Sequence, residues 1–216
     1  ISIGRQFVHL IPMTPASRAE QNAVWKPTLL GNAWYASCPA VLQDALLLHG
    51  RLRKVSAGGR VFEHGATDHA LYCVLSGQVQ AYYPDASGAM PLLATLDPPH
   101  WFGEICLFDD QPRTHDAYAE GATHLLRVPQ GALVKLLDAQ PRYWREFALL
   151  MSHKLRLAFV ALEQQSLMSA APRVAYRLLQ IAAGYGEVEG ARRVLQLSQE
   201  QLALMLALSR QTSPPL

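Results

Sequence analysis

The feature that most limits the fold is a stretch of short apolar segments between Arg51 and Val128, separated by turns such as Gly58-Gly59 and Ser76-Gly77. Short strands at this spacing favour an antiparallel sandwich or roll, because a parallel sheet would need helical crossovers. Leu71–Leu75 is apolar throughout, which indicates a buried strand. The expected strands are Arg51–Val55, Val61–Glu63, Leu71–Leu75, Gln78–Tyr83, Leu92–Leu96, Asp116–Ala119 and His124–Val128.

Helical patterns lie on both sides of this stretch. A short helix is expected after Pro39, ending near His49-Gly50, and another over Gly131–Leu137. Pro141 then opens a long helix that runs to about Met168, since proline suits the first turn of a helix. At about 1.5 Å per residue this helix is roughly 40 Å long, which is too long for a domain of this size to cover.

An apolar seam follows one side of the long helix. Met151, Leu155, Ala158 and Leu162 recur at alternating steps of four and three, and Gln165 continues the pattern. This is coiled-coil spacing, and a second copy of the same helix satisfies it most simply. We therefore predict a homodimer that meets along these residues. The alternative is a long helix packed on its own β domain.

A candidate phosphate-binding motif lies within Trp101–Thr114. Gly103 and Glu104 begin a short helical turn, whose backbone N–H groups favour an anion. Arg113 can donate two parallel charge-assisted hydrogen bonds to phosphate oxygens, and Thr114 adds a hydroxyl donor. Glu104 can accept a hydrogen bond from a sugar hydroxyl. The combination suits a phosphate ester of ribose, and the alternative is a surface turn with an exposed Arg and Glu.

The C-terminal stretch has helix-turn-helix spacing. Pro172 is expected to break or kink the long helix, and an amphipathic helix over Val174–Ile181 ends at Gly184-Tyr185-Gly186. Residues 190–197 indicate a turn and a strand. Two helices follow, joined by a turn at Ala207-Leu208, and the second helix of such a pair enters the DNA major groove. The alternative is an ordinary helical hairpin packed on its own core.

The expected DNA contacts lie around the second of these helices. Arg210 and Gln211 can bond bidentately to guanine and adenine edges. Ser209, Thr212 and Gln199 are better suited to phosphates, which position a protein without reading sequence.

Composition and residue spacing limit which other functional classes of protein the chain can belong to. The formal net charge is +2, so a nucleic-acid face must be a local patch. Cys38, Cys73 and Cys106 are widely separated, which argues against a disulfide framework or iron–sulfur cluster and fits a reducing cytosol. We find no metal-binding histidine spacing and no catalytic residue, so we predict neither a metal nor an enzyme. With no signal peptide and no apolar run near ~20 residues, we expect a cytoplasmic protein without a membrane partner.

Several motifs together resemble a known family. Gly59-x-x-Phe62-x-x-Gly65, Leu71–Gly77, and Phe102-Gly103-Glu104 with Pro112-Arg113-Thr114 are similar to the cyclic-nucleotide-binding β-roll. With the long helix and the helix-turn-helix, residues from about 25 to 212 resemble the cyclic-AMP receptor and fumarate–nitrate regulator (Crp/Fnr) family of bacterial transcription regulators.

The resemblance implies an α+β fold. It would comprise an N-terminal arm (1–22), an antiparallel β-roll or double-stranded β-helix that senses a ligand (23–138), a dimerisation helix (139–168) and an incomplete winged helix-turn-helix domain (169–216). Ligand binding would shift the population of DNA-binding arrangements in the homodimer. A palindromic promoter site and RNA polymerase would be its further partners.

The resemblance also assigns roles within the roll. Glu104 would meet the ribose 2′-hydroxyl, Arg113 and Thr114 the cyclic phosphate, and Gly103 would let the backbone approach the ligand. Two features depart from the cyclic-AMP binders. His115-Asp116 stand where a small Ala is usual, and Ala158-Phe159 stand where hydroxyl residues contact adenine. We therefore expect the roll to bind the phosphate of a cyclic nucleotide, or another small anion, without specificity for cyclic AMP.

The leading hypothesis is thus a ligand-responsive, DNA-binding transcription regulator. The alternative is a nucleotide-binding regulatory module that acts through protein contacts without DNA binding. An enzyme of the β-barrel type ranks third.

The residues after Thr212 generate a prediction. Ser213-Pro214-Pro215-Leu216 cannot continue a helix, whereas the family resemblance implies more recognition helix and a wing. We expect this 216-residue chain to bind DNA poorly in a mobility-shift assay. Tight, sequence-specific binding by this form would refute the expectation.

Overall fold

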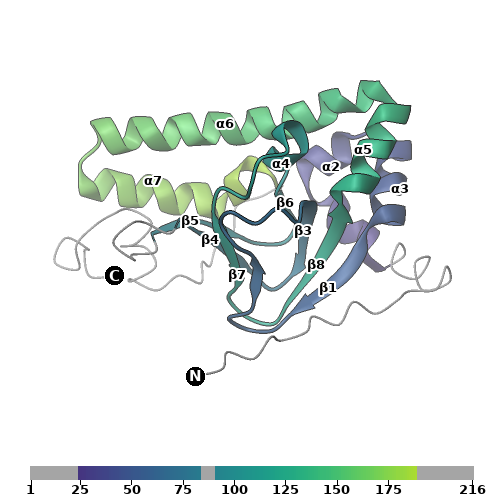
Figure 1. The fold of residues 1–216 in the computed structure, drawn as a ribbon. Helices are drawn as coiled ribbons and strands as arrows, with labels where there is room; N and C mark the ends of the chain where they lie inside the picture. The colour runs from purple at the N-terminus through teal and green to yellow at the C-terminus, as the bar shows by residue number, and fades with distance from the viewer. Residues whose placement is uncertain (1–23, 84–90, 189–216) are drawn as a thin grey trace.

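The strand-rich stretch forms two four-stranded antiparallel sheets that curl into a roll (Figure 1). This computed structural model describes residues 24–83 and 91–188. The first sheet has the order β1 (Arg51–Val55), β8 (Thr123–Pro129), β3 (Ala70–Ser76), β6 (His100–Phe102). The second has the order β2 (Arg60–Phe62), β7 (Asp116–Ala119), β4 (Val79–Tyr82), β5 (Leu92–Leu96).

Each predicted strand is confirmed, with bounds that differ by at most one residue at either end. The sequence prediction omitted β6, which pairs with β3 through Tyr72–Phe102, Cys73–Trp101 and Val74–His100. Two of its three residues, Trp101 and Phe102, belong to the stretch that the sequence analysis interpreted as a phosphate-binding motif, so no strand was expected there.

The apolar character of β3 follows from burial on both faces. Leu71, Cys73 and Leu75 belong to a core shared with the helices, whereas Tyr72 and Val74 belong to a second core inside the roll. Side chains alternate across a strand, so a strand between two cores must be apolar at every position.

Helices cover the outer face of the first sheet. Residues 24–30 are helical, and the other helices there are α2 (Ala33–Ser37), α3 (Ala40–His49), α5 (Gln130–Ala139), the 3-10 turn η1 (Pro141–Tyr143) and α6 (Trp144–Leu167). An aromatic group joins α2 and α6 to β6. The Trp34 ring lies 5.4 Å from Trp101 and 5.6 Å from Phe147, centroid to centroid.

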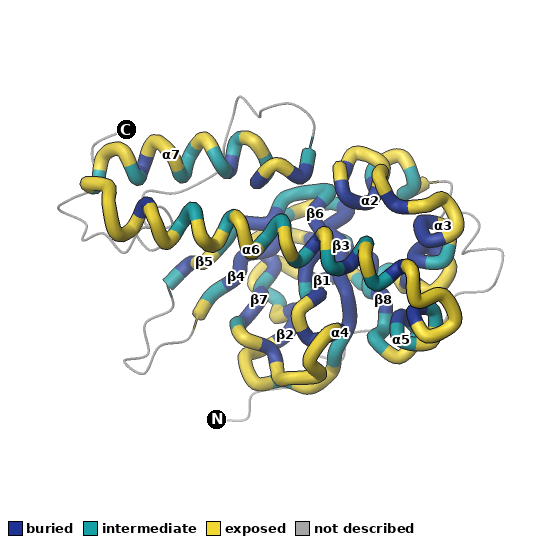
Figure 2. Tube along the Cα trace, turned by 90° about the horizontal axis from the view of Figure 1, so that it is seen from above, coloured by how far each residue is buried: buried dark blue, intermediate teal, exposed yellow. Residues whose placement is uncertain are grey.

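The long helix ends within one residue of the predicted end near Met168. α6 stops at Leu167, Met168 is extended (ψ 141°), and α7 (Ala170–Ala182) begins after Ser169. The predicted break at Pro172 is therefore misplaced, because Pro172 lies in the first turn of α7, where no backbone N–H has an intrahelical partner. Figures 1 and 2 show α7 running back alongside α6. The 3-10 turn η2 (Gly184–Gly186) follows it.

The predicted seam lies on the solvent side of α6. Leu155 and Leu162 are 54% and 60% exposed, Ala158 is exposed, and Met151 is half-buried. The yellow stretches of α6 in Figure 2 show how much of this helix remains uncovered. The buried face of α6 carries Phe147 and Leu150. The helix thus packs on its own domain along one side and leaves the seam uncovered.

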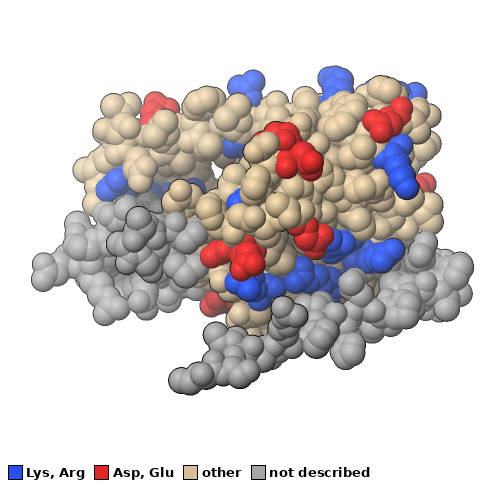
Figure 3. Space-filling view, viewed as in Figure 1, with Lys and Arg blue, Asp and Glu red and all other residues tan. Residues whose placement is uncertain are grey.

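Charges of both signs are spread over the face shown in Figure 3, with a band of Lys and Arg at the edge of the roll where β1 lies. Within the described ranges, no helix is long and apolar enough to cross a membrane. No group of three or more His, Cys, Asp or Glu among the same residues is placed to hold a metal ion. The predicted arm and the DNA-contact residues Gln199 and Ser209–Thr212 lie outside the described residues.

Candidate ligand-binding pocket

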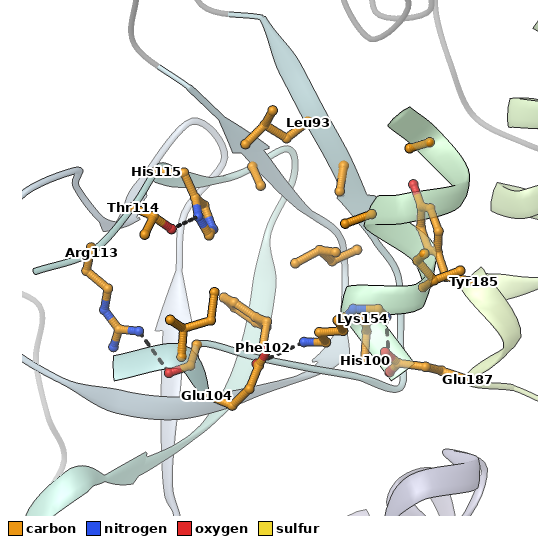
Figure 4. A pocket seen from close by; sticks show the side chains of 18 of the residues that line it. Leu93, His100, Phe102, Glu104, Arg113, Thr114, His115, Lys154, Tyr185 and Glu187 are labelled. Carbon is orange, nitrogen blue, oxygen red and sulfur yellow. Dashed lines mark hydrogen bonds and ion pairs between the residues drawn. The ribbon is translucent and has the colours of Figure 1, made fainter. Parts of the chain in front are cut away.

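A cavity of about 300 Å³ lies between the second sheet, the turn after β6, α6 and the α7–η2 segment (Figure 4). Its walls are mainly apolar, with a small number of charged and hydrogen-bonding groups. All four residues predicted to bind the ligand line it, namely Gly103, Glu104, Arg113 and Thr114. The four residues that the sequence pattern singled out therefore lie at one cavity.

Arg113 is buried at one end of the cavity, with 3% of its surface exposed. Its guanidinium donates from Nη1 to the Gly103 carbonyl (3.1 Å) and from Nη2 to the Ala70 carbonyl (2.8 Å). The Cζ atom lies 4.5 Å from the centre of the Phe62 ring, and the Nε–H is buried without a partner. This end of the cavity is a positive site held in place by backbone carbonyls and an aromatic face.

Gly103 is required by the local backbone and by Arg113. Its φ is +90°, a conformation that side-chain-bearing residues rarely adopt. A Cβ at this position would lie 2.8 Å from Arg113 Nη1 and 2.9 Å from the Ala70 carbonyl oxygen. The glycine therefore makes room for the guanidinium, a constraint that the sequence analysis did not foresee.

Glu104 is also buried, with 3% of its surface exposed, directly before α4 (Ile105–Asp109). The predicted short helical turn is thus confirmed. Lys154 of α6 donates to Glu104 Oε2 (2.9 Å) and to the Trp101 carbonyl. Because Glu104 and Arg113 are buried, the alternative of a surface turn with an exposed Arg and Glu is wrong.

Thr114 and His115 stand beside Arg113. Thr114 is exposed, and its hydroxyl lies 2.9 Å from His115 Nδ1. Burial, followed by the charge of Arg113, lowers the pKa of His115 and so favours a neutral ring. A neutral imidazole can accept the Thr114 proton, which would direct that hydroxyl toward the ring.

The end of the cavity opposite Arg113 is built by residues that sequence reasoning missed. Figure 4 shows Tyr185 and Glu187 across the cavity from Arg113. Arg177 also lines the cavity, with its guanidinium carbon 5.5 Å from the centre of the Tyr185 ring. These residues follow the long helix and carry no motif, so only their spatial position marks them. Ala158, predicted for the seam, also lines the cavity, whereas Met151, Leu155 and Leu162 do not.

The geometry at Gly103 gives a prediction. Gly103→Ala should lower the free energy of unfolding by about 1–3 kcal/mol, because it forces a side chain into a positive-φ conformation against Arg113. Urea unfolding measures the change. Gly121→Ala is the matched control, since a Cβ there meets nothing within 4 Å. Equal stability of the two variants would contradict the assignment.

Comparison with known proteins gives a consistent family. The model of the cyclic nucleotide-binding domain matches residues 52–140. The cyclic AMP receptor protein of Thermus thermophilus is 31% identical over 169 residues, which are 78% of this chain and 76% of that protein. The CRP-like cAMP-activated global transcriptional regulator of Mycobacterium tuberculosis is 31% identical over 157 residues, which are 72% of this chain and 70% of that protein.

A solved structure supports the same family. The catabolite activator protein of Thermus thermophilus is 29% identical and superposes with a TM-score of 0.55, covering 83% of this chain and 82% of that chain. The predicted roll with a long helix after it is therefore confirmed as the fold of such regulators. By sequence and by fold, the chain belongs to the cyclic-AMP receptor and fumarate–nitrate regulator (Crp/Fnr) family of bacterial transcription regulators.

Proposed function

We propose that the chain is a ligand-responsive transcription regulator whose roll binds a cyclic nucleotide and whose homodimer binds DNA. The main support for this ligand site is the buried Arg113 guanidinium at one end of an apolar cavity, which the Glu104 carboxylate also lines. The names of the two relatives, a cyclic AMP receptor and a cAMP-activated regulator, support a cyclic nucleotide as the effector class.

The residues present fit such a ligand. A volume of about 300 Å³ lies at the lower end of the ~300–1,000 Å³ range of small-molecule pockets, which suits a mononucleotide. Arg113 would donate to the cyclic phosphate, to which its charge-assisted hydrogen bonds are stronger than those to neutral carbonyls. Glu104 can keep its hydrogen bond from Lys154 and still accept one from a sugar hydroxyl, because a carboxylate accepts several hydrogen bonds.

The base would meet walls without the adenine-contacting hydroxyls of the cyclic-AMP binders. Ala158 lines the cavity and cannot donate a hydrogen bond, and Phe159 is 61% exposed. The proposed ligand is therefore a cyclic nucleotide whose base need not be adenine.

The ligand site is tested by calorimetry with cyclic AMP and with cyclic GMP. Arg113→Ala should weaken binding at least about tenfold, because each charge-assisted hydrogen bond contributes about 1.5–3 kcal/mol and 1.4 kcal/mol is a factor of ten. Arg113→Lys should also weaken it, because it keeps the charge but loses the planar fork. Arg145→Ala, which removes an exposed arginine of α6, is the control. Binding that is indifferent to Arg113 would show that the pocket is wrongly assigned.

We also propose that the exposed seam of α6 pairs with a second copy. A charged side chain buried in such a seam without a partner is strongly unfavourable. Leu155→Glu with Leu162→Glu should therefore raise the dimer dissociation constant at least about tenfold in analytical ultracentrifugation. Leu149→Glu is the matched control, since Leu149 is 44% exposed on the same helix but off the four-and-three spacing. The proposed pairing would be contradicted if the wild-type chain is a monomer, or if Leu149→Glu raises the dimer dissociation constant as much as the double variant does.

The proposed regulator has four parts and acts together with partners. Residues 23–138 would sense the ligand, 139–168 would dimerise, and 169–216 would contribute the DNA-binding region, after an arm over 1–22. A palindromic promoter site and RNA polymerase would be its partners in the cytoplasm. Family membership supports this role, and the Mycobacterium tuberculosis relative is named as a global transcriptional regulator.

A further inference from the structure

The short segment 184–188, directly after α7, is held against the roll by Glu187. Asn32 Nδ2 donates to Glu187 Oε2 (2.9 Å), and His100 Nδ1 lies 3.3 Å from the same oxygen. The backbone N–H of Ala33 donates to the Glu187 carbonyl (2.7 Å). One residue therefore joins the C-terminal segment to both α2 and β6. We call the group Asn32, His100 and Glu187 the clasp.

The clasped segment contains one strained residue, Tyr185. Gly184, Tyr185 and Gly186 have φ values of 56°, 56° and 77°, so three successive residues are left-handed. Tyr185 carries a side chain in this region, which costs free energy unless the surroundings hold it there. His153 Nε2 of α6 lies 2.8 Å from the Tyr185 carbonyl oxygen and helps to hold it.

The same segment closes the far end of the ligand pocket. Tyr185 and Glu187 line the cavity opposite Arg113, as Figure 4 shows. Arg177 joins them from α7, and its guanidinium donates to the Leu93 carbonyl of β5. Part of the ligand cavity is thus contributed by residues that lie beyond the long helix in the sequence.

The Glu187 carboxylate of the clasp is buried and only partly paired. Glu187 is 2% exposed, and its Oε1 is buried without a hydrogen-bond partner. Burial raises the pKa of Glu187, while Lys154, the Asn32 hydrogen bond and His153 act in the opposite direction and Glu104 acts with burial. A segment with one strained residue, anchored by an incompletely satisfied carboxylate, is suited to two positions, one docked and one released.

We propose that the clasp docks segment 184–188 as the far wall of the ligand pocket, so that ligand binding and docking stabilise each other. Glu187 is then a positioning residue that acts through Tyr185 and Arg177. The ligand-linked part rests on the proposed function. Because coupling between two equilibria is reciprocal, a released clasp must weaken ligand binding by the factor by which ligand favours docking. The segment leads directly into residues 189–216, so its position sets where the C-terminal region begins.

The experiment combines hydrogen exchange of the amides in 184–188 with calorimetry using cyclic AMP and cyclic GMP. Glu187→Ala should speed exchange in the ligand-free chain about tenfold and weaken nucleotide binding about fivefold or more. Glu187→Gln should restore both, because its amide oxygen can still accept from Asn32. Glu163→Ala, an exposed carboxylate of α6, should change neither.

A second variant perturbs the clasped segment through its backbone conformation. Gly186→Ala leaves Glu187 in place but disfavours the φ of 77°, so it should reproduce the effects of Glu187→Ala and keeps the test valid if that variant does not fold. Unchanged exchange in both variants would overturn the clasp. Faster exchange with unchanged nucleotide affinity would overturn the coupling while the proposed function stands. If the wild-type chain binds neither nucleotide, the proposed function and the coupling both fail, and exchange alone decides whether the clasp exists.

Discussion

The packing of Trp101 is the constraint on which the rest of the structure depends. Its side chain is fully buried, stacked on Tyr35 at 5.7 Å and edge-on to Trp34 at 5.4 Å. Aromatic side chains bury large apolar areas, so this contact fixes β6, the edge strand of the first sheet, against the helices. Lys154 of α6 donates to the Trp101 carbonyl, which ties the long helix to the same residue.

The neighbours of Trp101 then fall into distinct roles. His100 on one side contacts Glu187, and Phe102 on the other belongs to the core inside the roll. Gly103 leaves space for the Arg113 guanidinium, and Glu104 meets Lys154. Five consecutive residues therefore connect both cores, the ligand pocket, the long helix and the C-terminal segment. A displacement of β6 would reach all of these at once, because packed interiors transmit strain.

The pocket combines buried charges with apolar walls. Glu104 and Glu187 are both almost fully buried, and burying an unpaired carboxylate is costly. Lys154 pairs directly with Glu104 and also favours the charged form of Glu187. The cation thus serves a carboxylate of the roll and one of the C-terminal segment, and it comes from the helix between them in the sequence. This arrangement connects the proposed ligand site to the segment 184–188.

The sequence by itself determined seven of the strands, an antiparallel sandwich or roll, and the long helix, because turn spacing and helical periodicity are local properties. Motif resemblance narrowed this to a roll and singled out the group Gly103, Glu104, Arg113 and Thr114. The tertiary structure decided β6, the start of α7 before Pro172, and the far wall of the pocket. Glu104 pairs with a residue 50 positions away and Asn32 with one 155 positions away. Such contacts have no local period, since burial of a charge selects its partner in space and not along the chain.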